Sequence, residues 1–192
     1  MMVKICGITN VEDALAAVEG GAAALGFNFW PRSPRYVKPE AARKIIERLP
    51  VTVWKAGVFV DETAGAVEEM VREAGLNIAQ LHGRETAADF PSGVRVWKAI
   101  RIGASFDTAT LDEYPVEAVL LDGPANGVPF DWTQAAGAPK KVIIAGGLDA
   151  GNVRGAIEQA RPWGVDACSR IESVPGKKDH RKMAEFLKAA LI

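Results

Sequence analysis

The chain has 192 residues, 48% of them hydrophobic and 24% charged, which is ordinary for a globular protein large enough to bury one core. Its 23 Lys and Arg residues nearly balance 24 Asp and Glu residues, so the net charge of -1 excludes a global field that would attract nucleic acid or an anionic membrane. With two cysteines, no leader segment and no apolar run of about 18 residues, we expect a cytoplasmic protein with reduced thiols.

Eight short runs rich in β-branched and apolar residues predict eight strands. They span residues 3–6, 24–29, 55–60, 78–82, 95–100, 118–122, 142–146 and 165–169. Helix-like segments lie between them. The clearest is 10–21, where Asn10 can cap the N-terminus and Gly20–Gly21 ends the helix. Residues 39–49 and 63–75 have the same design.

This alternation predicts an α/β fold with a parallel sheet, because parallel strands need crossover connections. Eight units indicate a closed (β/α)₈ TIM barrel that occupies residues 1–192 as a single catalytic domain. The chain is slightly shorter than is usual for that barrel, so the helices after the fourth and sixth strands must be short. A doubly wound open sheet is the structural alternative.

The first predicted strand carries two chemically active side chains. Because residues alternate faces along a strand, Lys4 and Cys6 should point together into the barrel mouth. Val3 and Ile5 should face the helices. An ammonium near the thiol would lower the pKa of Cys6 and make it a base. The alternative is a cysteine that only packs, since free Cys is among the most buried residue types.

Later strands and loops carry further candidates, because sites in these barrels form where the strands end. Arg35 lies in a Pro-rich loop, where it could grip a carboxylate or belong to a solvated surface loop. Asp122 could deliver a carboxyl group to the mouth or cap the following loop. His82 and His180 are the only histidines, and the sequence has no metal signature, Walker loop or dinucleotide fingerprint.

The last two predicted strands are associated with candidate phosphate-binding residues. Gly146 and Gly147 can let backbone N–H groups approach a phosphate, although Gly-Gly alone is usually a turn. Asp166, Ser169 and Arg170 lie in or after the eighth strand. Because the loops after strands seven and eight form the common phosphate site of these barrels, the two segments together favour a phosphorylated ligand.

Taken in order, the motifs KICG, SPRY, QLHG, LLD, FDW, AGGL and VDACSRIES resemble those of the phosphoribosylanthranilate isomerase family. The resemblance extends from about Val3 to the last helix. It implies a (β/α)₈ barrel that catalyses the Amadori rearrangement of N-(5-phosphoribosyl)anthranilate to 1-(2-carboxyphenylamino)-1-deoxyribulose 5-phosphate in tryptophan biosynthesis. It also implies that no cofactor or metal is needed and that the partner is a small phosphorylated aminosugar.

Residue by residue, the resemblance implies that Cys6 is the general base, Asp122 the general acid and Arg35 the group facing the anthranilate carboxylate. It implies phosphate binding by Gly146, Gly147 and Ser169, with Arg170 as a further contact, and pocket lining by His82 and Asp166. We expect a monomer, because a closed barrel has no free sheet edge, with a homodimer as the alternative.

Two features depart from the family pattern. Arg170 stands where many members have Gly, and the loop over 122–132 is shorter, which predicts a truncated lid over the bound sugar.

Two other functions stay open. One is the related aminoaldose isomerase of the histidine pathway, which Cys6 argues against because two aspartates usually do that work. The other is an inactive phosphate-binding barrel used for interaction or regulation.

Overall fold

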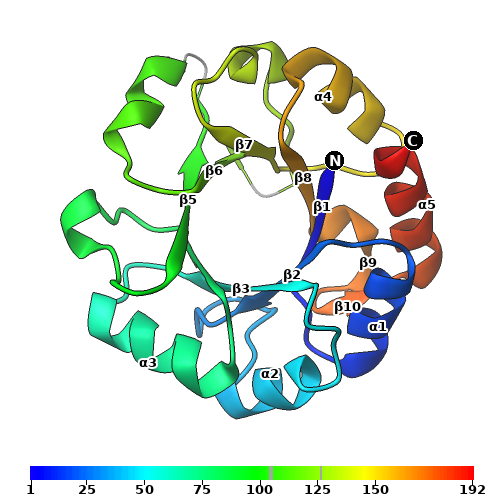
Figure 1. Ribbon diagram of the computed structural model, residues 1–192. Helices are drawn as coiled ribbons and strands as arrows, with labels where there is room; N and C mark the ends of the chain where they lie inside the picture. Colours follow the sequence, from blue (N-terminus) through cyan, green and yellow to red (C-terminus); the bar gives the residue numbers. More distant parts are fainter. Residues whose placement is uncertain (104–105, 126) are drawn as a thin grey trace.

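The computed structural model describes residues 1–103, 106–125 and 127–192, and its centre is a closed barrel of eight parallel strands (Figure 1). The strands are β1 (Met2–Cys6), β2 (Ala24–Asn28), β3 (Trp54–Phe59), β4 (Ile78–Leu81), β5 (Arg95–Arg101), β6 (Ala118–Asp122), β7 (Lys141–Ile144) and β8 (Gly164–Ala167). Each strand pairs with the next in the chain, and β8 pairs with β1. The predicted barrel is confirmed, and the open sheet is wrong.

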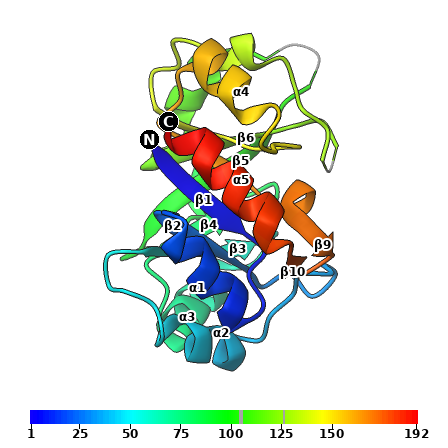
Figure 2. The ribbon, with the colours of Figure 1, turned by 90° about the vertical axis from the view of Figure 1, so that its right-hand side faces the viewer.

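Among the described residues, five α-helices surround the barrel (Figures 1 and 2). They are α1 (Val11–Glu19), α2 (Pro39–Ile46), α3 (Ala64–Ala74), α4 (Val153–Ala160) and α5 (His180–Leu191). The side chain of Asn10 accepts a hydrogen bond from the backbone N–H of Asp13, which confirms its capping role. Within the described ranges, no helix is both long and apolar enough to cross a membrane.

Short 3₁₀ helices occupy the remaining connections between barrel strands. They are η1 (Ala87–Asp89), η2 (Thr108–Glu113) and η3 (Trp132–Ala135), which follow β4, β5 and β6. The short elements after β4 and β6 agree with the expectation from chain length, and the connection after β5 is equally compact. The predicted lid lies between β6 and η3, and its residue Asn126 is outside the described residues.

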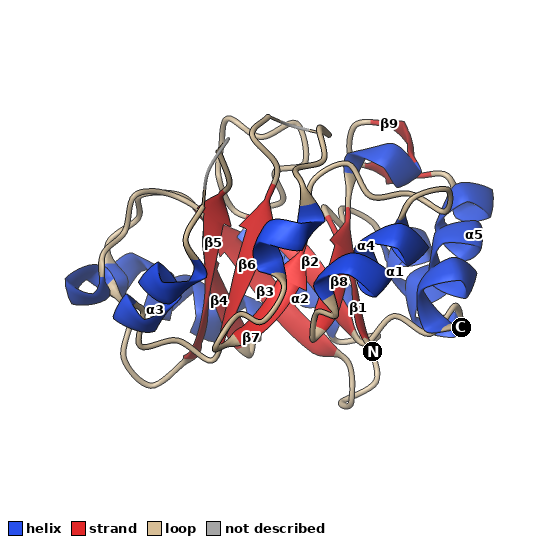
Figure 3. Ribbon diagram, turned by 90° about the horizontal axis from the view of Figure 1, so that it is seen from above, coloured by secondary structure: helices blue, strands red, loops and turns tan. Residues whose placement is uncertain are grey.

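After β8 the chain forms a small element that the sequence pattern does not predict. The 3₁₀ helix η4 (Ser169–Ile171) leads into an antiparallel hairpin of β9 (Glu172–Val174) and β10 (Lys177–Lys178). These strands are too short to show the alternation of apolar and polar residues that signals a strand. Figure 3 shows β9 on the same side of the barrel as the loops that follow its strands, so the hairpin borders the mouth.

Side chains on the barrel strands alternate between two apolar clusters. Val3 and Ile5 face outward and belong to the cluster shared with the helices, whereas Met2 and Trp97 belong to the cluster inside the barrel. This arrangement confirms the predicted alternation along β1. Lys4 and Cys6 therefore share the inward face with Met2.

Three tryptophans close the end of the barrel at which the strands begin. Trp54, Trp97 and Trp163 pack with ring centroids 5.8, 5.6 and 6.0 Å apart. The guanidinium of Arg95 lies 4.6 Å from the Trp54 ring centroid, and the ammonium of Lys141 lies 5.0 Å from that of Trp163. Because aromatic side chains fill this end, an internal site can open only at the C-terminal ends of the strands.

Candidate active site

A cavity of about 470 Å³ opens at the C-terminal ends of the strands. All nine residues that the sequence predicts for the site line it: Cys6, Arg35, His82, Asp122, Gly146, Gly147, Asp166, Ser169 and Arg170. The barrel thus brings together side chains and backbone from both ends of the chain. A cavity of this size is typical of sites for small molecules.

Lys4 is completely buried and forms an ion pair with Asp166 on β8, with Nζ and Oδ1 3.0 Å apart. Burial opposes the charge on Lys4, but the attraction of Asp166 and Cys6 outweighs it and raises the pKa of Lys4. Burial raises the pKa of Asp166 to about 7, against the attraction of Lys4. The ammonium therefore stays charged, whereas the carboxyl group can titrate near neutral pH.

Two thiols, those of Cys6 and Cys168, meet beside this ion pair. A hydrogen bond from Cys168 lowers the pKa of Cys6 well below the ordinary thiol value, and the ammonium groups of Lys4 and Lys178 act in the same direction against burial. The same hydrogen bond, together with burial, raises the pKa of Cys168. Cys6 is thus the thiolate of the pair, the form that accepts a proton.

The space around Cys6 depends on a glycine in the neighbouring strand β2. A Cβ at Gly26 would lie 2.7 Å from Sγ of Cys6 and 3.0 Å from Nζ of Lys4. A side chain there would displace the thiolate or its ammonium. Gly26 therefore allows the two charged groups to lie together against the β2 backbone.

Asp122 ends β6 and faces the cavity from another side. Its Oδ1 accepts a hydrogen bond from the backbone N–H of Gly123 at 2.9 Å. Its Oδ2 lies 3.3 Å from Nε2 of His82, a contact that lacks the alignment of a hydrogen bond. Since β7 and β8 separate β6 from β1, the Asp122 carboxyl group and the Cys6 thiolate can approach opposite sides of one ligand.

The loops after β6, β7 and β8 pack closely at the predicted phosphate end. Gly146 and Gly147 have φ values of 84° and 65°, a region that favours glycine. A Cβ at Gly147 would lie 2.5 Å from the carbonyl oxygen of Gly127. Arg170 donates to that same oxygen at 3.1 Å and approaches Oδ2 of Asp149 at 3.4 Å. The Arg170 guanidinium, from the loop after β8, therefore contacts the loops after β6 and β7.

Arg35 lies in the cavity wall, but its guanidinium is already engaged. Its Nε and Nη2 donate to the Glu172 carboxylate of β9 at 2.6 to 3.1 Å. Lys178 of β10 donates to the same carboxylate at 3.0 Å. These two cations outweigh burial and lower the pKa of Glu172. Within the described part of the chain no partner bonds to Nη1, so that edge of Arg35 is the one left for a ligand.

The structure adds site residues that the sequence analysis did not select. Cys168 and Gln80 line the cavity, and Glu172 and Lys178 support it from the hairpin. Oε1 of Gln80 is buried without a partner among the described residues, so it can accept a hydrogen bond from a ligand. Alternation along β4 could have revealed Gln80, which shares the face of His82, but no periodic pattern marks the hairpin residues.

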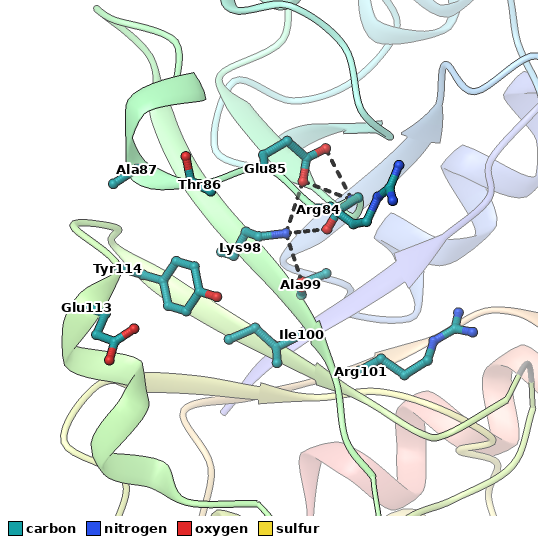
Figure 4. Close-up of a pocket in the computed structure, with 11 residues that line it drawn as sticks. Arg84, Glu85, Thr86, Ala87, Lys98, Ala99, Ile100, Arg101, Glu113 and Tyr114 are labelled. Carbon is teal, nitrogen blue, oxygen red and sulfur yellow. Dashed lines mark hydrogen bonds and ion pairs between the residues drawn. The ribbon is translucent and has the colours of Figure 1, made fainter.

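A second cavity, of about 320 Å³, lies between η1 and η2 (Figure 4). Figure 4 shows Lys98 and Glu85 turned toward each other there, with Nζ and Oε2 3.0 Å apart. The Lys98 ammonium also donates to the carbonyl oxygens of Gly83 and Ala99 at 2.7 and 3.2 Å. Because these charges satisfy one another, the cavity in the barrel mouth is the better candidate for a reactive site.

The described residues include no cluster of three or more Cys, His, Asp or Glu side chains arranged to hold a metal ion. The cavity instead offers a thiolate, two carboxyl groups, an imidazole and glycine-rich loops. These groups are suited to proton transfer on a phosphorylated ligand.

Comparison with known proteins agrees with this chemistry. Residues 3–189 match the family model described as N-(5'phosphoribosyl)anthranilate (PRA) isomerase. The chain is 54% identical to the N-(5'-phosphoribosyl)anthranilate isomerase of Solibacter usitatus over 196 aligned positions, which cover 99% of this chain and 97% of that protein.

Two solved structures extend the likeness to three dimensions. The phosphoribosyl anthranilate isomerase of Thermus thermophilus superposes with a TM-score of 0.94 at 37% identity, covering 100% of this chain and 98% of that one. A phosphoribosyl anthranilate isomerase in complex with reduced 1-(o-carboxyphenylamino)-1-deoxyribulose 5-phosphate gives a TM-score of 0.88 at 38% identity, with the same coverage.

Proposed function

Because this chain belongs to the N-(5'-phosphoribosyl)anthranilate isomerase family, we propose that Cys6 is the general base and Asp122 the general acid of its reaction. That reaction is the Amadori rearrangement of N-(5-phosphoribosyl)anthranilate in tryptophan biosynthesis, an aldose–ketose isomerisation. The family assignment decides against an inactive phosphate-binding barrel. It also favours this reaction over that of the histidine-pathway isomerase.

The proposed roles follow from the two proton transfers that the reaction needs. Asp122 protonates the furanose ring oxygen, which opens the aminosugar to an iminium ion. The Cys6 thiolate then removes the proton from C2′, and the resulting enolamine tautomerises to the ketone. The observation that carries this proposal is the paired placement of a low-pKa thiol and a carboxyl group across one cavity. His82 lies 3.3 Å from Asp122 and lines the same cavity.

Binding of the unreacting parts of the substrate orients the reacting carbon. We propose that backbone groups of Gly146, Gly147 and Ser169 hold the phosphate, and that Arg170 adds charge to this end. Arg35 would meet the anthranilate carboxylate through Nη1, since Glu172 occupies Nε and Nη2. His82 and Asp166 line the space between these ends.

Two conservative variants test the catalytic roles. We expect Cys6→Ser and Asp122→Asn each to lower kcat/KM by roughly 10²–10⁴-fold, because each removes proton transfer while keeping the shape of the side chain. The measurement is the loss of substrate fluorescence during turnover, with thermal unfolding to verify the fold. Asp112→Asn is the matched control, because Asp112 is exposed and outside the cavity lining.

Near-normal turnover by either variant would reject the corresponding role.

Complementation tests the reaction as a whole. A tryptophan auxotroph that lacks this isomerase should grow with the wild-type chain, and it should fail to grow with either variant.

We further propose that residues 1–192 act in the cytoplasm as one catalytic domain and as a monomer. Closure of the barrel supports the monomer, because pairing of β8 with β1 leaves no free edge in the described sheet. Exposed apolar side chains near the mouth, among them Trp30 and Tyr36, are what a homodimer would cover. Light scattering after gel filtration should give 20.5 kDa, and twice that mass would show the dimer.

A further inference from the structure

The only two cysteines of the sequence, Cys6 and Cys168, lie side by side in the active-site cavity. Cys6 ends β1, Cys168 directly follows the last residue of β8, and β1 and β8 are neighbours, as Figure 1 shows. The register pairs Lys4 with Asp166 and Ile5 with Ala167, so both cysteines come one residue after the last of these pairs. Two residues from opposite ends of the chain thus form an adjacent pair.

The geometry of this pair suits a covalent bond. Neighbouring strands lie about 4.7–4.9 Å apart. That separation falls inside the range of about 4.4–6.8 Å between the Cα atoms of disulfide-bonded cysteines. Both cysteines line the same cavity, and each thiol is close enough to shift the pKa of the other. The sulfur atoms can therefore meet without rearrangement of the strands.

We propose that Cys6 and Cys168 form a reversible disulfide that switches the isomerase off, with hydrogen peroxide as the oxidant. The link to activity rests on the proposed function, in which Cys6 is the general base. A disulfide-bonded sulfur at residue 6 has no thiolate to accept the C2′ proton. Oxidation would therefore stop turnover while leaving the barrel closed.

The surroundings of the pair favour oxidation of Cys6 first. Thiolates rather than thiols react with peroxides, and Cys6 is the thiolate of the pair. Its sulfur attacks one peroxide oxygen and the O–O bond breaks, which gives a sulfenic acid and releases hydroxide. The Lys4 ammonium stabilises the attacking anion, since it lies beside Cys6 and its pKa is raised.

Cys168 then resolves the sulfenic acid. Its sulfur attacks the Cys6 sulfur, the S–S bond forms, and water leaves with the thiol proton of Cys168. In sum, two thiols lose two electrons to one peroxide, and two molecules of water are produced. The ammonium of Lys178, 4.0 Å from Sγ of Cys168, stabilises the thiolate that Cys168 becomes during this attack. A small dithiol reverses the bond by exchange.

Hydrogen peroxide treatment of the full chain tests the proposal. For the wild type we expect an intact mass lower by two hydrogens, a cross-linked peptide that joins Cys6 to Cys168, and residual activity equal to the fraction not cross-linked. Dithiothreitol should restore both mass and activity. In Cys168→Ser, and in Cys168→Ala as a second variant, Cys6 should proceed to sulfinic acid, and dithiothreitol should not restore activity.

Each variant is compared with its own activity before oxidation, because Cys168 contacts Cys6. The proposal is overturned if Cys6 oxidises while Cys168 remains open to alkylation, or if both Cys168 variants recover as fully as the wild type. A cross-linked chain that keeps its activity would reject both the switch and the role of Cys6 as base. Absence of the cross-link together with an inactive Cys6→Ser variant would reject the switch alone.

Discussion

The ammonium of Lys4 lies between two anions, the Asp166 carboxylate at 3.0 Å and the Cys6 thiolate. Removing the cation and removing the carboxylate should therefore shift the Cys6 pKa in opposite directions. Lys4→Gln should raise it, since the thiolate loses its counterion, and Asp166→Asn should lower it, since a repelling charge disappears. Lys55→Gln is the control, because the ammonium of that buried lysine donates to the carbonyl oxygen of Pro50 and not to a group of the active site.

The pH dependence of iodoacetamide alkylation at Cys6, followed by peptide mass, measures these shifts. Relative to the wild type, the rise in alkylation rate should move to higher pH in Lys4→Gln and to lower pH in Asp166→Asn. Movement of both variants in the same direction would contradict the arrangement of charges. The measurement does not depend on turnover, so it is independent of the role of Asp166 in binding substrate.

The sequence predicts where the side chains of the barrel strands point better than it predicts which residues outside the barrel they contact. Strand alternation and the rule that sites form at strand ends are sufficient to place Lys4, Cys6 and Asp122 in the mouth. The Glu172 carboxylate that engages Arg35 could not be predicted, because it lies in a hairpin with no periodic pattern. The closeness of Cys6 and Cys168 depends on the register in which β1 pairs with β8, which the sequence pattern does not give.

Among the elements, the connections after β4 and β5 are compact, and a buried ion pair fills the space beside them. Lys98 and Glu85 are 3% and 6% exposed. The Glu85 carboxylate also accepts hydrogen bonds from the backbone N–H groups of Asp61 and Gly83. One ion pair and its carbonyl contacts thus hold the connection after β4 against the outer face of the barrel.

Breaking this pair should destabilise the fold. We expect Lys98→Met to lower the free energy of unfolding by about 3–5 kcal/mol, because it leaves the Glu85 charge buried without its counterion. The double variant Lys98→Met, Glu85→Leu should recover part of that loss. Urea denaturation gives both values. In the control Arg43→Met, the lost ion pair with Glu47 is about 60% exposed on both sides, and the cost should be at most about 1 kcal/mol.

If Lys98→Met lowers the free energy of unfolding as little as the control does, the ion pair adds little to stability.

The sequence predicts all eight barrel strands and the first three helices, because β-branched runs and capping residues mark them. It does not predict the Lys98–Glu85 pair. The strand pattern places Lys98 on the outward face, but only the folded loop brings Glu85 to it.

For the molecule as a whole, closure of the barrel joins the two ends of the chain. The termini lie near each other in Figures 1 and 2, and α5 lies beside β1. The pairing of β1 with β8 completes the sheet and delivers Asp166, Cys168 and the hairpin to the active site. The proposed base Cys6 and the carboxylate of Asp166 therefore come together only when β1 pairs with β8.

The pairing of β1 with β8 has a consequence for synthesis on the ribosome. The counterion of Lys4, Asp166, is made 162 positions later, a delay of roughly 8–30 s at typical elongation rates. During that interval the ammonium has no buried partner and must stay hydrated, so the barrel cannot close. Ribosome-bound chains that lack β8 should therefore be cleaved readily by a protease, and resistance should arise only once the last strand emerges.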